Sequence, residues 1–448
     1  MSEPTPYPRP AYAWYCLGVI CFAYLFGFMD RIIVGLLTPA IQKDIGLSDG
    51  QMGIIQGLAF AVFYTLFGLP LGRAADRANR KWLLSAGTAI WSLMTAGAGL
   101  VRSFGGLFFM RAGVGVGEAT LNPCATSLIG DYFRPESRAR AFGIYTMSTA
   151  LGTGVTYLGG GLVIGFIGGP AGGNSFDMPL LGAIPAWQAV FILIGIAGLV
   201  PALLMALTIR EPARRDLTRG SGAQASWAET RAFLRQNRTT LLCHHFGVAF
   251  ILMAIYGWVN WLPTLFVRLH DWPVARFSIW YGIFGGSAGI LSAIASGYVT
   301  GWFRKRGHSD GSMRTVLVGG IGLTLGTSIA PLLPTPELVL AGYCITGIFT
   351  NFPPAQALAA VAEITPNQLR GFVTSLYVFV IGIAGAGLGP WVMGMVTDQV
   401  FGDPMKIHYS IALVTFVMGL LGIALVSYGL KSYRESVARA TWTGSAAG

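Results

Sequence analysis

The chain has 448 residues, of which 53% are hydrophobic and 11% charged, and its formal net charge is +11. Because this small number of polar side chains cannot cover the surface of a soluble protein, the expected solvent is a lipid bilayer. The 62 glycines fit that environment, because small residues let membrane helices approach closely. The composition thus excludes a soluble globular domain and favours an all-α membrane protein.

Apolar stretches of about twenty residues, the length that spans a bilayer, recur in two groups of six. They predict twelve transmembrane helices in two six-helix halves, 1–209 and 239–448, joined by a cytoplasmic linker at 210–238. The expected spans are 14–38, 51–72, 82–101, 106–129, 140–167 and 186–209 in the first half, and 239–267, 277–302, 315–333, 337–360, 371–397 and 408–430 in the second.

The linker contains a glycine and serine run, Gly220, Ser221 and Gly222, followed by a stretch with amphipathic spacing at 227–234. Glycine and serine are typical of linkers. The second stretch fits either a short interfacial helix or a solvated chain.

Lysines and arginines are concentrated in the odd-numbered loops and in the tails. The positive-inside rule therefore places both termini in the cytoplasm. This distribution explains the positive charge as a topology signal, with membrane lipids and not nucleic acid as the expected partners. We expect an integral, multi-pass protein of a bacterial inner membrane that functions as a monomer.

The five cysteines lie in apolar stretches without a CxxC pair, and the five histidines are scattered, so no disulfide framework or metal site is indicated. His244 and His245 begin a span without matching carboxylates or cysteines, which disfavours a membrane enzyme. A phosphate-cradling loop is also missing from the sequence, which disfavours ATP as the energy source. We expect no cofactor, and a receptor or scaffold stays an alternative to a transporter.

Four charged residues lie in the interior of predicted spans, away from the span ends, namely Asp30 and Arg31 in the first and Arg111 and Glu118 in the fourth. A charged side chain near the bilayer centre costs about 2.5 to 3.5 kcal/mol, so each needs a partner or a wet cavity. Structural ion pairing is the alternative to a functional role. We predict that Asp30 and Glu118 exchange protons and that Arg31 contributes to substrate binding.

The fourth span has a predicted polar stripe, because Arg111, Gly115, Glu118 and Asn122 recur at i, i+4, i+7 and i+11. Arg111 and Glu118 lie about 10 Å apart along the helix axis. Arg111 is therefore expected to reach Asp30 or an anionic substrate, and Asn122 is a further substrate-binding candidate. Loss of an arginine contact would favour protonation of a carboxylate, which makes the proton the expected coupling ion.

Two loops recur at an offset of six spans, as expected for a transporter with duplicated halves. Residues 72–81 and 297–306 both begin with glycine and end with basic residues, and residues 135–142 and 366–372 share proline, arginine and phenylalanine. The first of these loops resembles the signature of the major facilitator superfamily, through the residues Gly72, Asp76, Arg77, Arg80 and Lys81.

In that family the loop latches the cytoplasmic gate. The resemblance therefore implies a gate role for a set of residues at the cytoplasmic side, namely Gly72, Asp76, Arg77, Arg80, Arg140 and Arg370. The alternative is that the arginines only set the topology. Asp76 is expected to accept hydrogen bonds from free backbone donors at the start of a neighbouring helix.

Residues 24–37, 111–119 and 131–133 resemble the spinster family of sphingosine phosphate and lysophospholipid transporters. The resemblance implies alternating-access transport of a small amphiphilic or anionic substrate. Organic-anion and proton symporters of the same superfamily share these motifs. A proton-driven multidrug exporter is less favoured, because the fifth span lacks a glycine-proline pair.

The spans of the second half contain no clearly buried charge and carry several aromatic residues, among them Tyr256, Trp258 and Phe352. One charged half and one aromatic half suit an amphiphile, with the headgroup at Arg111 and the tail on these rings. Ordinary packing or an interfacial belt is the alternative for each ring.

Overall fold

The computed structural model describes residues 7–168, 175–179, 181–214 and 226–445, and the run Gly220 to Gly222 of the linker lies outside them. The chain divides into two compact units. The first consists of Met1–Thr218 and Asp271–Gly286, and the second of Arg219–His270 and Ser287–Gly448. The sequence-based division at 1–209, 210–238 and 239–448 stays a prediction.

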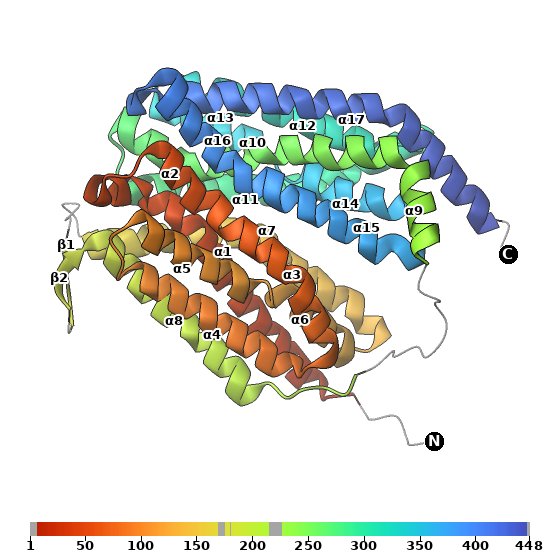
Figure 1. Cartoon of the computed structure of the whole chain (residues 1–448), viewed down its shortest axis with the longest axis horizontal. Helices are drawn as coiled ribbons and strands as arrows, with labels where there is room; N and C mark the ends of the chain where they lie inside the picture. The colour runs from red at the N-terminus through yellow and green to blue at the C-terminus, as the bar shows by residue number, and fades with distance from the viewer. Residues whose placement is uncertain (1–6, 169–174, 180, 215–225, 446–448) are drawn as a thin grey trace. The chain divides into compact units, whose positions relative to one another are not determined.

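Long helices build the first unit, with α4 lying between α5 and α8 (Figure 1). Serine or asparagine caps several helix starts, for example Ser103 before α5, whose hydroxyl accepts a hydrogen bond from the Gly106 amide. The helices are α1 Pro10–Ile45, α2 Asp49–Gly53, η1 Ile54–Leu58, α3 Ala59–Arg77, α4 Arg80–Ala98, α5 Phe104–Glu118, α6 Leu121–Tyr132, α7 Pro135–Gly168 and α8 Ala186–Thr208, with the first part of α11 Val274–Lys305.

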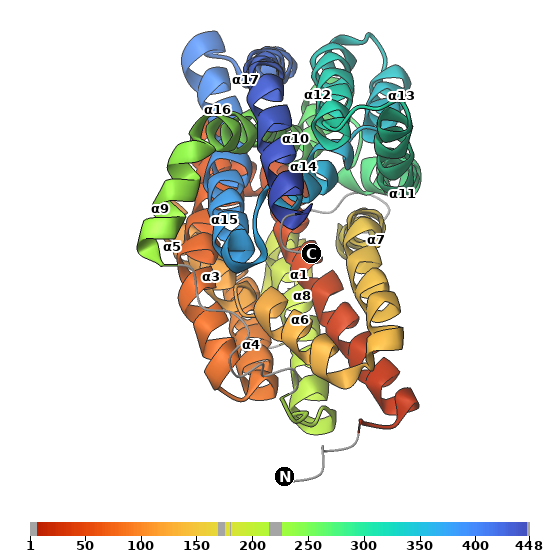
Figure 2. The same ribbon diagram turned by 90° about the vertical axis from the view of Figure 1, so that its right-hand side faces the viewer.

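The second unit is organised around α10 and α17, which pack along each other, with α12 beside α17 (Figure 2). Its helices are α9 Trp227–Gln236, α10 Arg238–His270, the rest of α11, α12 Gly311–Ile329, η2 Ala330–Leu332, α13 Pro336–Gly347, α14 Phe352–Ile364, α15 Asn367–Val380, η3 Ile381–Gly387, α16 Leu388–Val396, η4 Thr397–Phe401, η5 Pro404–Lys406 and α17 Ile407–Ser445.

Within the described residues, nine helices are long and apolar enough to cross a membrane, and α7 becomes a tenth if its two bent parts form one span. The spans predicted at 82–101 and 106–129 correspond to α4 and to α5 with α6. The number twelve and the cytoplasmic position of the termini therefore stay predictions.

Two local features differ from or extend the expected helices. A short antiparallel hairpin, β1 Ser175–Met178 and β2 Gly182–Pro185, interrupts the all-α architecture between α7 and α8. In the linker, the predicted helix is present as α9, while its position at a membrane interface stays a prediction. A capping box between Ser226 and Glu229 starts α9, and Trp227 packs edge-on against Phe372.

The close contact of α4 and α8 gives a direct test of the packing in the first unit. A Cβ on Gly195 would lie 2.3 Å from the Ala96 amide nitrogen, whereas a Cβ on Gly18 would meet no atom within 4 Å. We expect Gly195→Ala to destabilise the protein by roughly 1 to 3 kcal/mol through overpacking, as measured by thermal unfolding in detergent. Gly18→Ala is the matched control, and equal unfolding temperatures for the two variants would contradict the packing described.

Candidate functional site

Arg31 of α1 and Glu118 at the end of α5 form an ion pair within the first unit. The Arg31 Nη2 atom lies 2.5 Å from Glu118 Oε2, and Arg31 Nε donates to the same oxygen at 2.7 Å. The Glu118 side chain is 0% exposed, while that of Arg31 is 30% exposed. Glu118 Oε1 accepts no hydrogen bond from the part of the chain that the structure describes. The pair thus has one accessible member and one carboxylate oxygen that Arg31 does not use.

Aromatic rings surround the Arg31 guanidinium. Its Cζ atom lies 5.7 Å from the ring centroid of Phe28, 5.0 Å from that of Phe60 and 5.2 Å from that of Tyr64. Ring faces attract a cation at such distances. The guanidinium therefore keeps a favourable contact even when Glu118 does not carry a charge.

Glycines place Glu118 beside Arg31. A Cβ on Gly115 would lie 2.6 Å from the Phe60 carbonyl oxygen, and one on Gly117 would lie 2.7 Å from the Gly87 carbonyl oxygen. Only glycine lets α5 approach α3 and α4 this closely. On α1, a Cβ at Gly27 would lie 3.5 Å from Glu118 Cδ, so this glycine leaves room for the carboxylate.

Arg111 and Asp30 are both 3% exposed. Arg111 Nη1 donates a hydrogen bond of 3.0 Å to the backbone carbonyl oxygen of Asp30, not to its carboxylate. Among the described residues, Asp30 Oδ1 and Arg111 Nε have no hydrogen-bond partner. Two arginines and two carboxylates thus share one buried cluster, in which Asp30 forms no ion pair within the described ranges.

The prediction that one helix carries the whole polar stripe of the fourth span is wrong in one respect. The helix is interrupted after Glu118, and Asn122 lies in the next helix, α6. Its Nδ2 donates to the Tyr64 hydroxyl at 3.2 Å, and the Tyr145 hydroxyl donates to its Oδ1 at 2.6 Å. Asn122 therefore joins the cluster through Tyr64, whose ring lies against Arg31.

Sequence analysis did not identify Phe28, Phe60, Tyr64 or Tyr145 as members of this cluster. Each is an aromatic residue in an apolar span, and the spacing along one helix does not report contacts made between helices. The hydroxyl groups of the two tyrosines were the available signal, because a buried hydroxyl usually finds a hydrogen-bond partner.

Among the residues assigned to the cytoplasmic gate, Arg80 lies at the centre of a second charged cluster. It is 1% exposed and pairs with Asp131 and Glu211, with its Nε 2.7 Å from Glu211 Oε1. Its Nη1 also donates to the Ser127 hydroxyl at 2.8 Å. The beginning of the predicted linker thus belongs to the packed structure of the first unit.

The other proposed gate residues are more exposed. Gly72 lies in α3, Asp76 and Arg77 are exposed at its end, and the Arg140 guanidinium lies 5.4 Å from the Trp14 ring centroid. In the second unit, Arg370 donates to the Ala362 carbonyl oxygen at 3.4 Å.

The expected backbone contact of Asp76 is not formed within the described residues. The neighbouring helix, α4, is capped instead by Asn79, whose side-chain oxygen accepts a hydrogen bond from the Trp82 amide at 3.2 Å. Asn79 lies directly before α4, which is the position from which a side chain reaches the free amides of the first turn.

The second unit contains a counterpart of the Arg80 cluster. Arg304 at the end of α11 pairs with Glu363 at the end of α14, and its side chain is 54% exposed. The Tyr433 hydroxyl donates to Glu363 Oε2 at 2.6 Å. Arg80 and Arg304 come from the two loops that recur in the sequence, although Arg80 begins a helix and Arg304 lies in the last turn of one.

The three aromatic candidates of the second unit differ in their surroundings. Trp258 is 1% exposed and stacks on Tyr343 with ring centroids 4.7 Å apart, and Phe352 is 3% exposed beside Phe349. Tyr256 is 40% exposed. Trp258 and Phe352 therefore pack the interior of this unit, as the alternative interpretation stated.

The model of the Major Facilitator Superfamily matches residues 20–310. The chain is 25% identical over 441 residues to an MFS-type efflux pump of Mycolicibacterium smegmatis, covering 95% of this chain and 94% of that protein. It is 24% identical over 426 residues to the hexuronate transporter of Bacillus subtilis, covering 91% and 96%.

A solved structure extends the similarity to three dimensions. This is a bacterial homologue of the human lysosomal transporter spinster, in an inward-facing and occupied conformation. It superposes with a TM-score of 0.75 at 25% identity and covers 96% of this chain and 97% of that chain. The resemblance to the spinster family noted in the sequence is thus confirmed.

Proposed function

Because the chain belongs to the Major Facilitator Superfamily, we propose that it is a proton-coupled transporter that moves an anionic amphiphile of the lysolipid or sphingolipid kind by alternating access. Family membership makes it an integral, multi-pass membrane transporter of a small molecule and not an enzyme, as expected from the sequence. The bacterial structures it resembles agree with an inner-membrane location.

The proposed topology has twelve spans with both termini in the cytoplasm. Nine helices qualify by length and apolarity within the described residues, and α4, the pair α5 and α6, and α7 supply three more helical segments where spans are expected. We further propose that the protein works as a monomer, and that it uses the proton as coupling ion and no cofactor.

The observation that carries the proposal is the ion pair between Arg31 and Glu118. When Glu118 is ionised, it holds the guanidinium, and when it takes up a proton, its negative charge is lost and Arg31 is released. The released guanidinium, already partly exposed, is then available to an anion. Asp30 is the second carboxylate of the cluster and supplies a nearby group through which the proton passes.

The surroundings of Arg31 favour an amphiphile over a purely polar acid. The rings of Phe28, Phe60 and Tyr64 lie within 6 Å of its cation, so a charged headgroup and an adjoining apolar segment meet matching surfaces at one place. Arg111 and Asn122 complete the proposed headgroup site within the first unit.

The test is uptake of a fluorescent lysophospholipid into proteoliposomes with an imposed proton gradient. We expect Arg31→Gln to weaken substrate binding by roughly 10- to 100-fold, because a hydrogen bond to a charged group contributes about 1.5 to 3 kcal/mol. Arg235→Gln, at an exposed arginine of α9, is the matched control and should behave as wild type. Equal uptake by both variants would exclude Arg31 from the substrate site.

A second candidate function is symport of an organic anion with protons. Its support is the hexuronate transporter, which is similar along nearly the whole chain. A competition assay distinguishes the two functions. Complete displacement of the lysolipid by an excess of glucuronate would favour organic-anion symport. Uptake of an apolar cation would favour a multidrug exporter, and no proton-dependent flux of any solute would favour a receptor or scaffold.

The gate role of Gly72, Asp76, Arg77, Arg80, Arg140 and Arg370 is also a proposal. Its support is the exposed position of Asp76 beside the buried Arg80 cluster. We expect Asp76→Asn to reduce transport while leaving the unfolding temperature unchanged. Wild-type uptake rates for this variant would remove Asp76 from the gate.

A further inference from the structure

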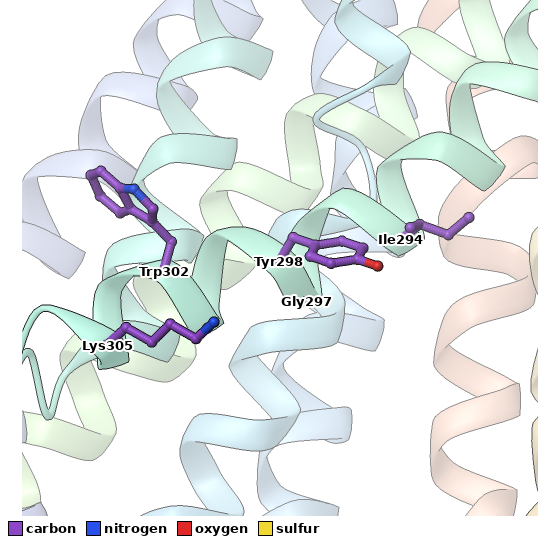
Figure 3. A pocket seen from close by; sticks show the side chains of 6 residues that line it. Ile294, Gly297, Tyr298, Trp302 and Lys305 are labelled. Atoms are coloured by element: carbon purple, nitrogen blue, oxygen red, sulfur yellow. The ribbon is translucent and has the colours of Figure 1, made fainter.

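The exposed side of α11 in the second unit carries a groove of about 540 Å³ (Figure 3). A Cβ on Gly297 or Gly301 would meet no atom within 4 Å, so the glycines form an open floor. The volume falls within the range of roughly 300 to 1,000 Å³ that is typical of small-molecule sites. The groove is lined by Ile294, Gly297, Tyr298, Gly301, Trp302 and Lys305.

Large apolar side chains flank this floor and remain exposed. Ile294 is 56% exposed, Tyr298 77% and Trp302 51%, and α11 is one of the helices that qualify as membrane spans. Figure 3 shows the side chains of Tyr298 and Trp302 projecting from the helix that carries Gly297. Exposed apolar surface on a span faces the acyl chains of the bilayer, so the groove opens toward lipid.

Positive charge gathers at one end of the groove. The helix ends in Arg304 and Lys305, followed by Arg306, and the first of these is neutralised by Glu363. Lys305 and Arg306 form no ion pair with the residues that the structure describes, and the Arg306 guanidinium lies 3.5 Å from the Trp302 ring centroid. Tryptophan and basic residues together are typical of the headgroup level of a membrane.

We propose that this groove binds an anionic phospholipid, with its phosphate at Lys305 and Arg306 and one acyl chain along Gly297 and Gly301. The two cations, which form no ion pair with a described carboxylate, match the charge of the headgroup, because juxtamembrane lysines and arginines attract anionic lipids. The apolar floor and its aromatic flanks match the chain. The site lies entirely in the second unit and does not depend on the proposed transport substrate.

A second copy of the chain is the competing occupant, because glycines four residues apart also favour close pairing of membrane helices. In a two-fold dimer the basic ends of both α11 helices would lie at the same depth, and their like charges would repel. Tyr298 and Trp302 also rise above the glycine floor and would hold a second helix away from it. Charge and shape therefore favour lipid.

Native mass spectrometry of the purified protein tests this assignment with phosphatidylglycerol and with phosphatidylethanolamine of the same acyl chains. We expect phosphatidylglycerol to bind more tightly to the wild type, and the double variant Lys305→Gln, Arg306→Gln to lose roughly 30-fold in affinity for it. Gly301→Leu, which fills the groove, should also weaken binding. Lys431→Gln removes an exposed cation of α17 and is the matched control.

Three outcomes would overturn the proposal: equal affinity of the two lipids, equal phosphatidylglycerol binding by the double variant and the control, or unchanged binding by Gly301→Leu. A dimer mass in the wild type that is absent in Gly301→Leu would assign the groove to a second copy instead. Unchanged unfolding temperatures would show that the substitutions at this exposed surface leave the fold intact.

Discussion

The Glu118→Gln variant is expected to lose uptake driven by a proton gradient, down to the level of vesicles without protein, while it still exchanges substrate across the membrane. Glutamine keeps the shape of the side chain but neither binds a proton at neutral pH nor holds Arg31 by charge. The guanidinium is then permanently available to the anion. Substrate exchange does not require net proton movement, so it should survive.

Two measurements on the same proteoliposomes separate these effects: uptake under an imposed proton gradient, and counterflow of labelled substrate without one. Glu136→Gln is the matched control, because Glu136 is an exposed carboxylate at the start of α7. Retention of gradient-driven uptake by Glu118→Gln would show that the proton is carried elsewhere. Loss of counterflow as well would assign Glu118 to substrate binding and not to coupling.

Arg80→Ala is expected to produce the largest loss of stability in the first unit. Arg80 is buried between Asp131 and Glu211, so its removal leaves two carboxylates without their cation. Breaking a buried ion pair in this way costs about 3 to 5 kcal/mol. For a unit of this size the unfolding temperature should fall by roughly 10 °C, as measured by thermal unfolding in detergent.

Arg77→Ala serves as the control for that experiment, because Arg77 is exposed at the end of the preceding helix, α3, and forms no ion pair within the described residues. It should unfold within about 1 °C of wild type, since exposed charges contribute little. A similar loss in both variants would mean that the positive charge of the loop matters and not the pairing of Arg80.

Much of the fold could be predicted from the sequence, because apolar runs and loop charges report directly on the bilayer. The helix break after Glu118 was not predicted, although Pro123 is a signal for it in the sequence. Proline has no amide hydrogen to donate to the carbonyl oxygen four residues earlier, at Ala119, and its ring clashes with that carbonyl, so the helix ends there and α6 begins anew at Leu121.

Sequence reasoning found the charged members of the site but not their pairing. A charged side chain deep in a membrane span has a high free-energy cost, so such residues are expected to be functional. This criterion identified Asp30, Arg31, Arg111 and Glu118 from the sequence. Which arginine pairs with which carboxylate depends on the rotation of α1 relative to α5. This rotation cannot be deduced from a single sequence. The structure therefore pairs Glu118 with Arg31 and leaves Arg111 on a backbone carbonyl.

The two related charge clusters differ in their access to water, since the Arg80 side chain is 1% exposed and that of Arg304 is 54% exposed. Dissolved ions screen an exposed pair strongly and a buried pair weakly. Ionic strength should therefore act unevenly on a molecule built from repeated halves. Concentrated sodium chloride is expected to loosen the loop ends of the second unit before those of the first.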